Sequence, residues 1–426
     1  MSHFAYHDGV LHAEGSALSA IAAQFGTPTY VYSKAALLGN FAAYADACQG
    51  RDALVCYAMK ANSNLAILDL LARQGAGFDI VSGGELLRVI AAGADPRKVI
   101  FSGVGKSVEE IALALSHEIL CFNVESIPEL QRLNQVAGEM GKVAPVSLRV
   151  NPNVDAKTHP YIATGLKANK FGIAYDDALD TYRAAARLPH LRVTGIDCHI
   201  GSQLLDDAPL LEALDKLIEL IDTLSAEGIE LHHLDIGGGI GIDYGEQGEP
   251  APVPVADYLG RLFRRIDAWR AARHRGAPLK VIFEPGRSIV GDSGVLLTRV
   301  EYIKPGAEKN FCVVDAAMND MMRPALYQAW MPMLTVLEQK EAGLTYDVVG
   351  PICESGDWLA RERELDVRPG ELLAMMAAGA YGMTMASNYN TRGRPAEVIV
   401  DGGQCHLVRR RETPAELFAM ETTLGR

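Results

Sequence analysis

The sequence predicts an α/β protein with a second, mainly antiparallel β domain: a closed (β/α)8 barrel of the TIM type, with β strands after it. Eight short, nearly continuous apolar runs alternate with helix patterns from about residue 54 to 286, which is typical of parallel strands buried on both faces. After about residue 290, apolar runs continue without regular helices between them. An open, doubly wound sheet is the alternative, because one miscounted strand would fit it as well.

The eight runs are expected to form the barrel strands in chain order, at residues 54–59, 78–81, 99–102, 119–123, 146–150, 195–199, 231–236 and 281–284. Helix patterns follow the first and second runs at residues 65–76 and 85–92, and both end at glycines. A third pattern repeats leucine and isoleucine at helical spacing over residues 210–224. Eight βα units within about 230 residues favour closure into a barrel.

The remaining apolar runs predict the second domain. Strands are expected at residues 296–304, 311–314, 346–349 and 397–400. Short β-like pieces before about residue 28 are expected to join the same domain. The predicted division is therefore a barrel at 29–287 and a β domain, a sandwich or small barrel, made of 1–28 together with 288–426.

Composition narrows the class of protein. Hydrophobic residues make up 49% and charged residues 22% of 426 residues, as in globular proteins. A net charge of −13 without a basic block disfavours nucleic acid and anionic membranes as partners. The longest uncharged apolar stretch, about residues 372–385, is shorter than a membrane span, and no secretory signal is expected. Seven scattered cysteines without a CxxC pair predict reduced thiols in the cytoplasm and no metal site.

A barrel places functional side chains at the carboxyl ends of its strands. Lys60 ends the first apolar run, where a buried ammonium is costly. Either this lysine extends to solvent at the rim, or it forms a Schiff base, which removes the charge. His199 ends the sixth run, and is either a core histidine or a ring that stacks on a flat ligand. No second histidine or cysteine stands at ligand spacing on that element, so a metal is not expected there.

Two glycine-containing turns follow the seventh and eighth runs. Residues 235–241 (DIGGGIG) allow backbone N–H groups to approach a phosphate, although a tight turn explains them equally well. Residues 284–287 (EPGR) add a cation at the neighbouring strand end, and a local salt bridge is the alternative.

Candidates in the β domain are fewer. Cys353 lies among carboxylates in the run CESGD, and an ordinary buried thiol is the plain alternative. Arg323 and Tyr327 are four residues apart, so in a helix they would face one side and could bind a carboxylate together. Outside a helix they would be surface residues.

Six ordered motifs resemble those of the fold-type III pyridoxal phosphate decarboxylases, most closely the branch that acts on diaminopimelate. They are YAMKAN at 57–62, HIGSQ at 199–203, GGG at 237–239, EPGR at 284–287, CESGD at 353–357 and AYG at 380–382. The resemblance runs from about residue 28 to 415, and the six motifs together make it specific.

This resemblance implies pyridoxal 5'-phosphate as the cofactor, held covalently by Lys60, with His199 stacked on its ring. Glu284 would pair with the ring nitrogen and keep it protonated, so that the ring can take up the electrons left by departing CO₂. The other residues implied in cofactor binding are Asp79, Ser202, Gly237, Gly238, Gly239, Gly286, Arg287 and Tyr381.

The implied reaction converts meso-2,6-diaminopimelate into L-lysine and CO₂, the last step of lysine biosynthesis. By resemblance, Cys353 returns a proton to the substrate carbon, and Glu354 accepts a hydrogen bond from the distal ammonium. The residues implied in binding the rest of the substrate are Arg287, Arg323, Tyr327 and Tyr381. The alternatives are an ornithine-, arginine- or carboxynorspermidine-type decarboxylase of the same fold, or a catalytically inactive PLP-binding regulator.

Family members share their active sites between subunits, with Cys353 and Glu354 reaching the site of the other subunit. The resemblance therefore implies a homodimer, which the residues alone do not show. Residues 159–172 also match the family, and are expected to form either a flap over the site or a plain loop.

Overall fold

The computed structural model describes residues 3–155, 170–273, 279–339 and 343–425. Contacts divide the chain into two compact units. The barrel unit comprises residues 40–242 and 250–288, and the β unit comprises residues 1–39, 243–249 and 289–426. The strand at 29–33 thus belongs to the β unit, because it pairs with two strands of that unit and with none of the barrel.

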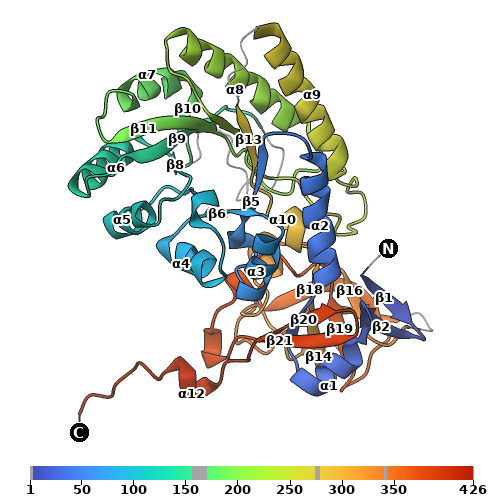
Figure 1. Cartoon of the computed structure of the whole chain (residues 1–426). Coiled ribbons are helices and arrows are strands. Elements are labelled where there is room, and N and C mark those ends of the chain that lie inside the picture. Colours follow the sequence, from blue (N-terminus) through green and yellow to red (C-terminus); the bar gives the residue numbers. More distant parts are fainter. Residues whose placement is uncertain (1–2, 156–169, 274–278, 340–342, 426) are drawn as a thin grey trace. The chain divides into compact units, whose positions relative to one another are not determined.

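The barrel closes in the order in which the chain runs (Figure 1). Every neighbouring pair is parallel, and the last strand returns to pair with the first. Its strands are β5 (Ala53–Ala58), β6 (Gly77–Ile80), β7 (Val99–Phe101), β8 (Cys121–Val124), β9 (Ala144–Asn151), β11 (Leu191–Asp197), β12 (His233–Asp235) and β13 (Lys280–Phe283). A two-residue strand, β10 (Ile173–Ala174), pairs with β9 outside the ring. The prediction of a closed parallel barrel is confirmed, and each of the eight expected runs contains or overlaps one strand.

Helices cover the outside of the ring. Four of them begin directly after a capping side chain, which satisfies a backbone N–H in the first turn; the caps are Asn64, Ser82, Ser107 and Ser126. The helices are α2 (Lys34–Ala47), α3 (Leu65–Arg73), α4 (Gly83–Ala91), α5 (Val108–Ser116), α6 (Ile127–Glu139), α7 (Tyr175–Ala185), α8 (Ala208–Ala226), α9 (Val255–Arg273) and α10 (Arg287–Val290).

The expected helix at 65–76 ends three residues early, at Arg73. Gly75 there adopts a φ of +89°, and its N–H and that of Gln74 bond back to Ala72 and Leu71, which closes the helix. The helix expected at 85–92 begins earlier, at Gly83, because Ser82 caps it.

The β unit is mainly antiparallel, as predicted. Its strands are β1 (Phe4–His7), β2 (Val10–Ala13), β3 (Ser16–Ala17), β4 (Thr29–Ser33), β14 (Gly294–Lys304), β15 (Asn310–Val314), β16 (Met333–Thr335), β17 (Leu344–Val349), β18 (Trp358–Leu365), β19 (Leu372–Met375), β20 (Ala396–Asp401) and β21 (Gln404–Arg409). Among the described strands of this unit, only the β15–β17 and β4–β20 pairs are parallel. Short helices α1 (Leu18–Phe25), α11 (Arg323–Tyr327) and α12 (Pro414–Leu417) complete it.

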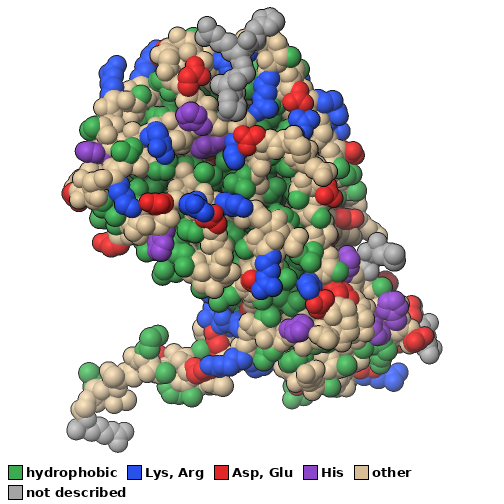
Figure 2. Space-filling model, in the orientation of Figure 1, with side chains coloured by type: hydrophobic (Ala, Val, Ile, Leu, Met, Phe, Trp, Pro, Cys, Tyr) green, Lys and Arg blue, Asp and Glu red, His purple; other side chains and the backbone are tan. Residues whose placement is uncertain are grey.

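The surface mixes both signs of charge. On the face shown in Figure 2, basic and acidic side chains are interspersed with apolar ones. In the described part of the chain, no helix has the length and apolar character that crossing a membrane requires.

Candidate active site at the carboxyl end of the barrel

The interior of the barrel changes from apolar to charged along its strands. Cys56, Ile100, Cys121 and Ile282 form a buried apolar cluster. Side chains two residues apart on a strand share a face, so the positions two residues further on also point inward. Among these are Asn123 and Glu284. The carboxyl end of the barrel is therefore lined with polar groups.

Lys60 follows β5 directly, in the 3-10 turn η1 (Met59–Ala61). Its ammonium donates to Asp79 Oδ2 at 2.8 Å, and the Asp79 side chain is fully buried, whereas 35% of the Lys60 side chain is exposed. An amine that is held by a buried carboxylate but open to solvent can reach a carbonyl reagent. The two predicted residues are thus brought together.

His199 is held by the glycine turn. The Gly238 N–H donates to His199 Nδ1 at 3.2 Å, which requires an unprotonated Nδ1. Burial, followed by the charges of Arg149 and Lys60, holds the pKa of His199 well below its usual value. The ring is therefore neutral at neutral pH, and suits stacking on a flat ligand.

Close packing explains the glycines. A Cβ on Gly238 would lie 2.1 Å from the Glu284 carbonyl oxygen, so no side chain fits there. The Gly237 N–H donates to Asp235 Oδ1 at 2.8 Å, and that of Gly238 to His199. Among the described residues, only Gly239 of the three has no acceptor for its N–H, so it is the one ready to bind an anion.

Arg287 and Ser202 form a second anion-binding pair. Arg287 begins α10, and its Nε and Nη2 both donate to Ser202 Oγ, at 3.3 and 3.2 Å. The Pro285 carbonyl accepts from the Ala58 N–H, and a Cβ on Gly286 would lie 3.1 Å from the Ala58 oxygen. This turn therefore packs against the end of β5, beside Lys60.

Three carboxyl groups lie together below these residues. One side-chain oxygen from each of Asp197, Asp235 and Glu284 lies within 4.8 Å of those of the other two. Burial first, and then neighbouring carboxylates, raises the pKa of Glu284 and Asp197 well above the usual range, and that of Asp235 to about 7. Sequence reasoning missed Asp197. The signal was an acid inside a predicted apolar strand, two residues before His199.

Arg149, at the end of β9, anchors the loop that follows. Its Nη1 donates to Glu125 Oε1 at 3.1 Å, and its guanidinium lies 4.9 Å from the Phe171 ring. The Gly172 N–H donates to Glu125 Oε2 at 2.9 Å. Residues 159–169 of the expected flap lie outside the described residues, and 170–172 form this anchored end.

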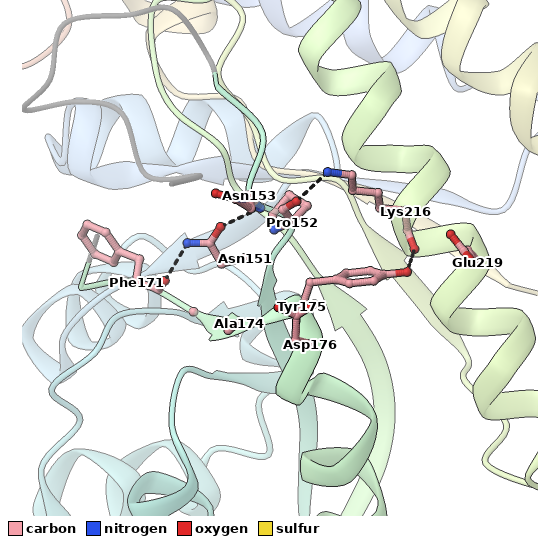
Figure 3. Close-up of a pocket in the computed structure, with 10 residues that line it drawn as sticks. Asn151, Pro152, Asn153, Phe171, Ala174, Tyr175, Asp176, Lys216 and Glu219 are labelled. Carbon is pink, nitrogen blue, oxygen red and sulfur yellow. Dashed lines mark hydrogen bonds between the residues drawn. The ribbon is translucent and has the colours of Figure 1, made fainter. Parts of the chain in front are cut away.

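A pocket of about 280 Å³ lies beside this anchor (Figure 3). Its lining residues come from the end of β9, from the segment around β10 and from α8. Lys216 Nζ donates to the Pro152 carbonyl at 2.9 Å, and the Tyr175 hydroxyl donates to the Lys216 carbonyl at 3.1 Å. These bonds connect α8 to the end of β9 and to the first residue of α7.

In the β unit, Cys353 lies on a tightly held loop. Buried Asp357 accepts from the N–H groups of Met318 and Ile352, each at 2.7 Å. The Cys353 N–H donates to Asn390 Oδ1 at 3.0 Å. The thiol is exposed, so the alternative of an ordinary buried cysteine is wrong. Glu354 is exposed next to it.

Arg323 and Tyr327 are the first and last residues of α11, so the conditional prediction of a helix there is confirmed. Arg323 is buried, and its guanidinium lies 4.8 Å from the Tyr244 ring. Tyr327 and Tyr381 are half-buried, and Tyr381 has a φ of +55°. A buried guanidinium beside aromatic rings suits a planar anion such as a carboxylate.

Comparison with known proteins identifies relatives of this chain. Residues 35–291 match the family described as "Pyridoxal-dependent decarboxylase, pyridoxal binding domain". Diaminopimelate decarboxylase of Pseudomonas aeruginosa is 58% identical, and that of Vibrio cholerae 54% identical, over all of this chain and all of theirs. The crystal structure of diaminopimelate decarboxylase from M. jannaschii with L-lysine matches with a TM-score of 0.91 and 39% identity, covering 99% of this chain and 98% of that one.

Proposed function

Since this chain belongs to the diaminopimelate decarboxylases of the pyridoxal-dependent decarboxylase family, we propose that it converts meso-2,6-diaminopimelate into L-lysine and CO₂. It is a PLP-dependent carboxy-lyase. One observation carries the proposal. The Lys60 amine bonds to buried Asp79 at the carboxyl end of the barrel, where the Ser202–Arg287 pair and Glu284 also lie.

The residues present fit pyridoxal phosphate. Lys60 supplies an amine for its aldehyde, and His199 a neutral ring for its face. Donors for a phosphate come from Ser202, Arg287 and the N–H of Gly239. The turn that carries Gly239 needs a glycine at Gly238, because a Cβ there would clash with the Glu284 carbonyl oxygen. When bound, the cofactor stabilises the negative charge that develops on the substrate carbon as CO₂ leaves.

The remaining cofactor residues are assigned on the family pattern. Glu284 is buried beside two other carboxyl groups, so it can carry a proton and share it with the ring nitrogen. We also assign Asp79, Gly237, Gly286 and Tyr381 to cofactor binding.

Substrate recognition requires a cation for the distal carboxylate and an acceptor for the distal ammonium. We assign the first role to Arg323 with Tyr327, and the second to Glu354. Arg287 and Tyr381 complete the substrate set. Cys353 donates the proton that replaces CO₂, and its exposure leaves the thiol accessible.

The decisive experiment is CO₂ release with meso-diaminopimelate, ornithine and arginine, reading out lysine by mass. Lys60→Ala is expected to abolish turnover and the near-visible absorbance of the bound cofactor. Lys98→Ala, which changes a half-buried lysine of the same unit whose ammonium lies at the surface, keeps both. Turnover of ornithine in preference to diaminopimelate would reject the substrate assignment. No turnover of any candidate would favour an inactive regulator.

We further propose a homodimer that shares its active sites. Apolar side chains on successive βα junctions of the barrel are 40–49% exposed and lie on the same rim: Leu65, Val81, Val104, Val108 and Ile127. Exposed apolar groups gathered in this way are typical of an interface. Cys353 and Glu354, exposed on the β unit, are the residues expected to enter the partner's site.

Mixing two inactive variants tests this assembly. If Lys60 and Cys353 of one site come from different chains, mixed Lys60→Ala and Cys353→Ala dimers contain one intact site, and random mixing gives about a quarter of wild-type activity. If activity does not return although mixed dimers form, the shared site is rejected. The free thiols of the described cysteines also suit the cytoplasm that we propose as its location.

A further inference from the structure

The three buried carboxyl groups of the barrel mouth have a structural origin in strand pairing. Asp197 on β11 pairs directly with Asp235 on β12, so both side chains point to the same side. Asp235 pairs in turn with Ile282 on β13, and Glu284 lies two residues beyond Ile282. Parallel pairing therefore brings Asp197, Asp235 and Glu284 to one place inside the barrel; they are called the carboxyl trio below.

The trio contains more carboxyl groups than the nearby cations can neutralise. Its side chains are between 0 and 5% exposed. Each nearby cation is paired with an acid outside the trio, Lys60 with Asp79 and Arg149 with Glu125. In the described structure, no salt bridge reaches the trio itself, and Asp197 Oδ1 is buried without a hydrogen-bond partner. Neutral or acidic groups surround the other two: Asn123 Nδ2 donates to Glu284 Oε1 at 3.5 Å, and Asp235 lies against the side chains of Glu284 and Asn123.

Three adjacent carboxylates cannot all ionise in such a place. Like charges at this separation favour protonated forms, and burial adds to that preference. The titratable groups around the trio do not neutralise this excess of negative charge. They are Asp79, Lys60, Glu125, Arg149, the thiols of Cys56, Cys121 and Cys198, and His233, whose pKa burial lowers to about 4 so that its ring is neutral. The raised pKa values of all three groups agree with this view.

We propose that Asp197, Asp235 and Glu284 share protons as one unit, and that Asp197 is a positioning residue that keeps a proton available at Glu284. This rests on the proposed pairing of Glu284 with the ring nitrogen of the cofactor. In that pairing Glu284 would supply its O–H proton to the nitrogen and would itself become a carboxylate. The total charge is unchanged, so no proton has to enter from solvent.

The role of Asp197 follows from its place in the trio. It does not need to touch the cofactor, because the negative charge that the trio shares raises the proton affinity of Asp235, the strand neighbour beside Glu284, whenever that charge rests on Asp197. Replacing Asp197 with asparagine keeps the shape and removes the repulsion. The remaining pair, Asp235 and Glu284, then releases its proton at lower pH.

The first test uses the protein without cofactor. Infrared difference spectra follow the C=O band of protonated carboxyl groups as pH rises, in wild type, in Asp197→Asn and in the control Asp180→Asn, an exposed acid of α7 that pairs with Arg183. We expect a wild-type band that persists above pH 6, a midpoint lower by about one pH unit or more in Asp197→Asn, and no change in the control. Equal midpoints in wild type and Asp197→Asn would overturn proton sharing. A midpoint that moves with chelator would also overturn it, because a bound cation would then hold the trio.

The second test measures cofactor dissociation against pH. The pH above which affinity falls should move down by a similar amount in Asp197→Asn and stay fixed in Asp180→Asn; an unchanged profile would overturn the link to Glu284. CO₂ release by the wild-type enzyme is measured in parallel. Absence of that activity would reject the proposed function alone, because the cofactor-free titration does not depend on it.

Discussion

Lys106 offers the sharpest test of how the barrel mouth is held together. This side chain is fully buried, and its three ammonium hydrogens have three acceptors, each at 2.7 Å: the carbonyls of Gly103 and Asn123, and Glu129 Oε1. Lys106→Met keeps the length of the chain but leaves Glu129, only 7% exposed, as an uncompensated buried charge. Removing one partner of such a pair costs about 3–5 kcal/mol. Because neither side chain is open to solvent, screening does not reduce this figure.

Urea unfolding of the full chain, followed by far-UV circular dichroism, measures the loss. Lys98→Met is the matched control, since Lys98 is half-buried but its ammonium lies at the surface and donates to the Gly75 carbonyl, and it should cost less than about 0.5 kcal/mol. Adding Glu129→Gln to Lys106→Met removes the stranded charge and should recover part of the stability. A loss below about 1 kcal/mol in Lys106→Met would refute the reasoning.

Three further changes test the β unit. Cys353→Ser should slow turnover by about 100-fold while the cofactor dissociation constant stays within twofold, because the hydroxyl is a poorer acid; equal turnover would remove Cys353 as the proton donor. Asn390→Gly keeps the left-handed backbone (φ +55°) but removes the acceptor of the Cys353 N–H, so kcat should fall about fivefold, whereas Asn390→Asp keeps the acceptor and stays near wild type. Burial raises the pKa of Asp320 from 3.8 to about 7. The folded state therefore holds more protons than the unfolded state, and stability present below pH 4 is lost as pH rises towards 7, by about 4 kcal/mol. In Asp320→Asn, the denaturant midpoint of this unit should depend less on pH over that range than in wild type. An equal pH dependence in both proteins would contradict the assignment.

The sequence supports much of the fold because local patterns carry it. Apolar runs located the barrel strands, since strands buried on both faces need no partner information to be recognised. Lys60 and His199 could be found from their places at strand ends. Contacts between side chains on distant elements could not be found in this way. Lys106 and Glu129 are 23 residues apart, and nothing in the local sequence shows that this lysine points inward rather than to solvent.

The same contrast explains why Lys60, and not Lys106, is suited to hold a cofactor. Both are lysines in the loops at the carboxyl end of the barrel. Forming a covalent bond with an aldehyde requires a deprotonated amine and removes its hydrogens. Lys106 would give up three hydrogen bonds and leave Glu129 without its partner, so this side chain has a structural role. The Lys60 ammonium bonds to buried Asp79 and the Lys60 side chain is 35% exposed, so its amine can be reached from solvent. Burial with saturated acceptors thus makes one lysine inert, and partial exposure leaves the other reactive.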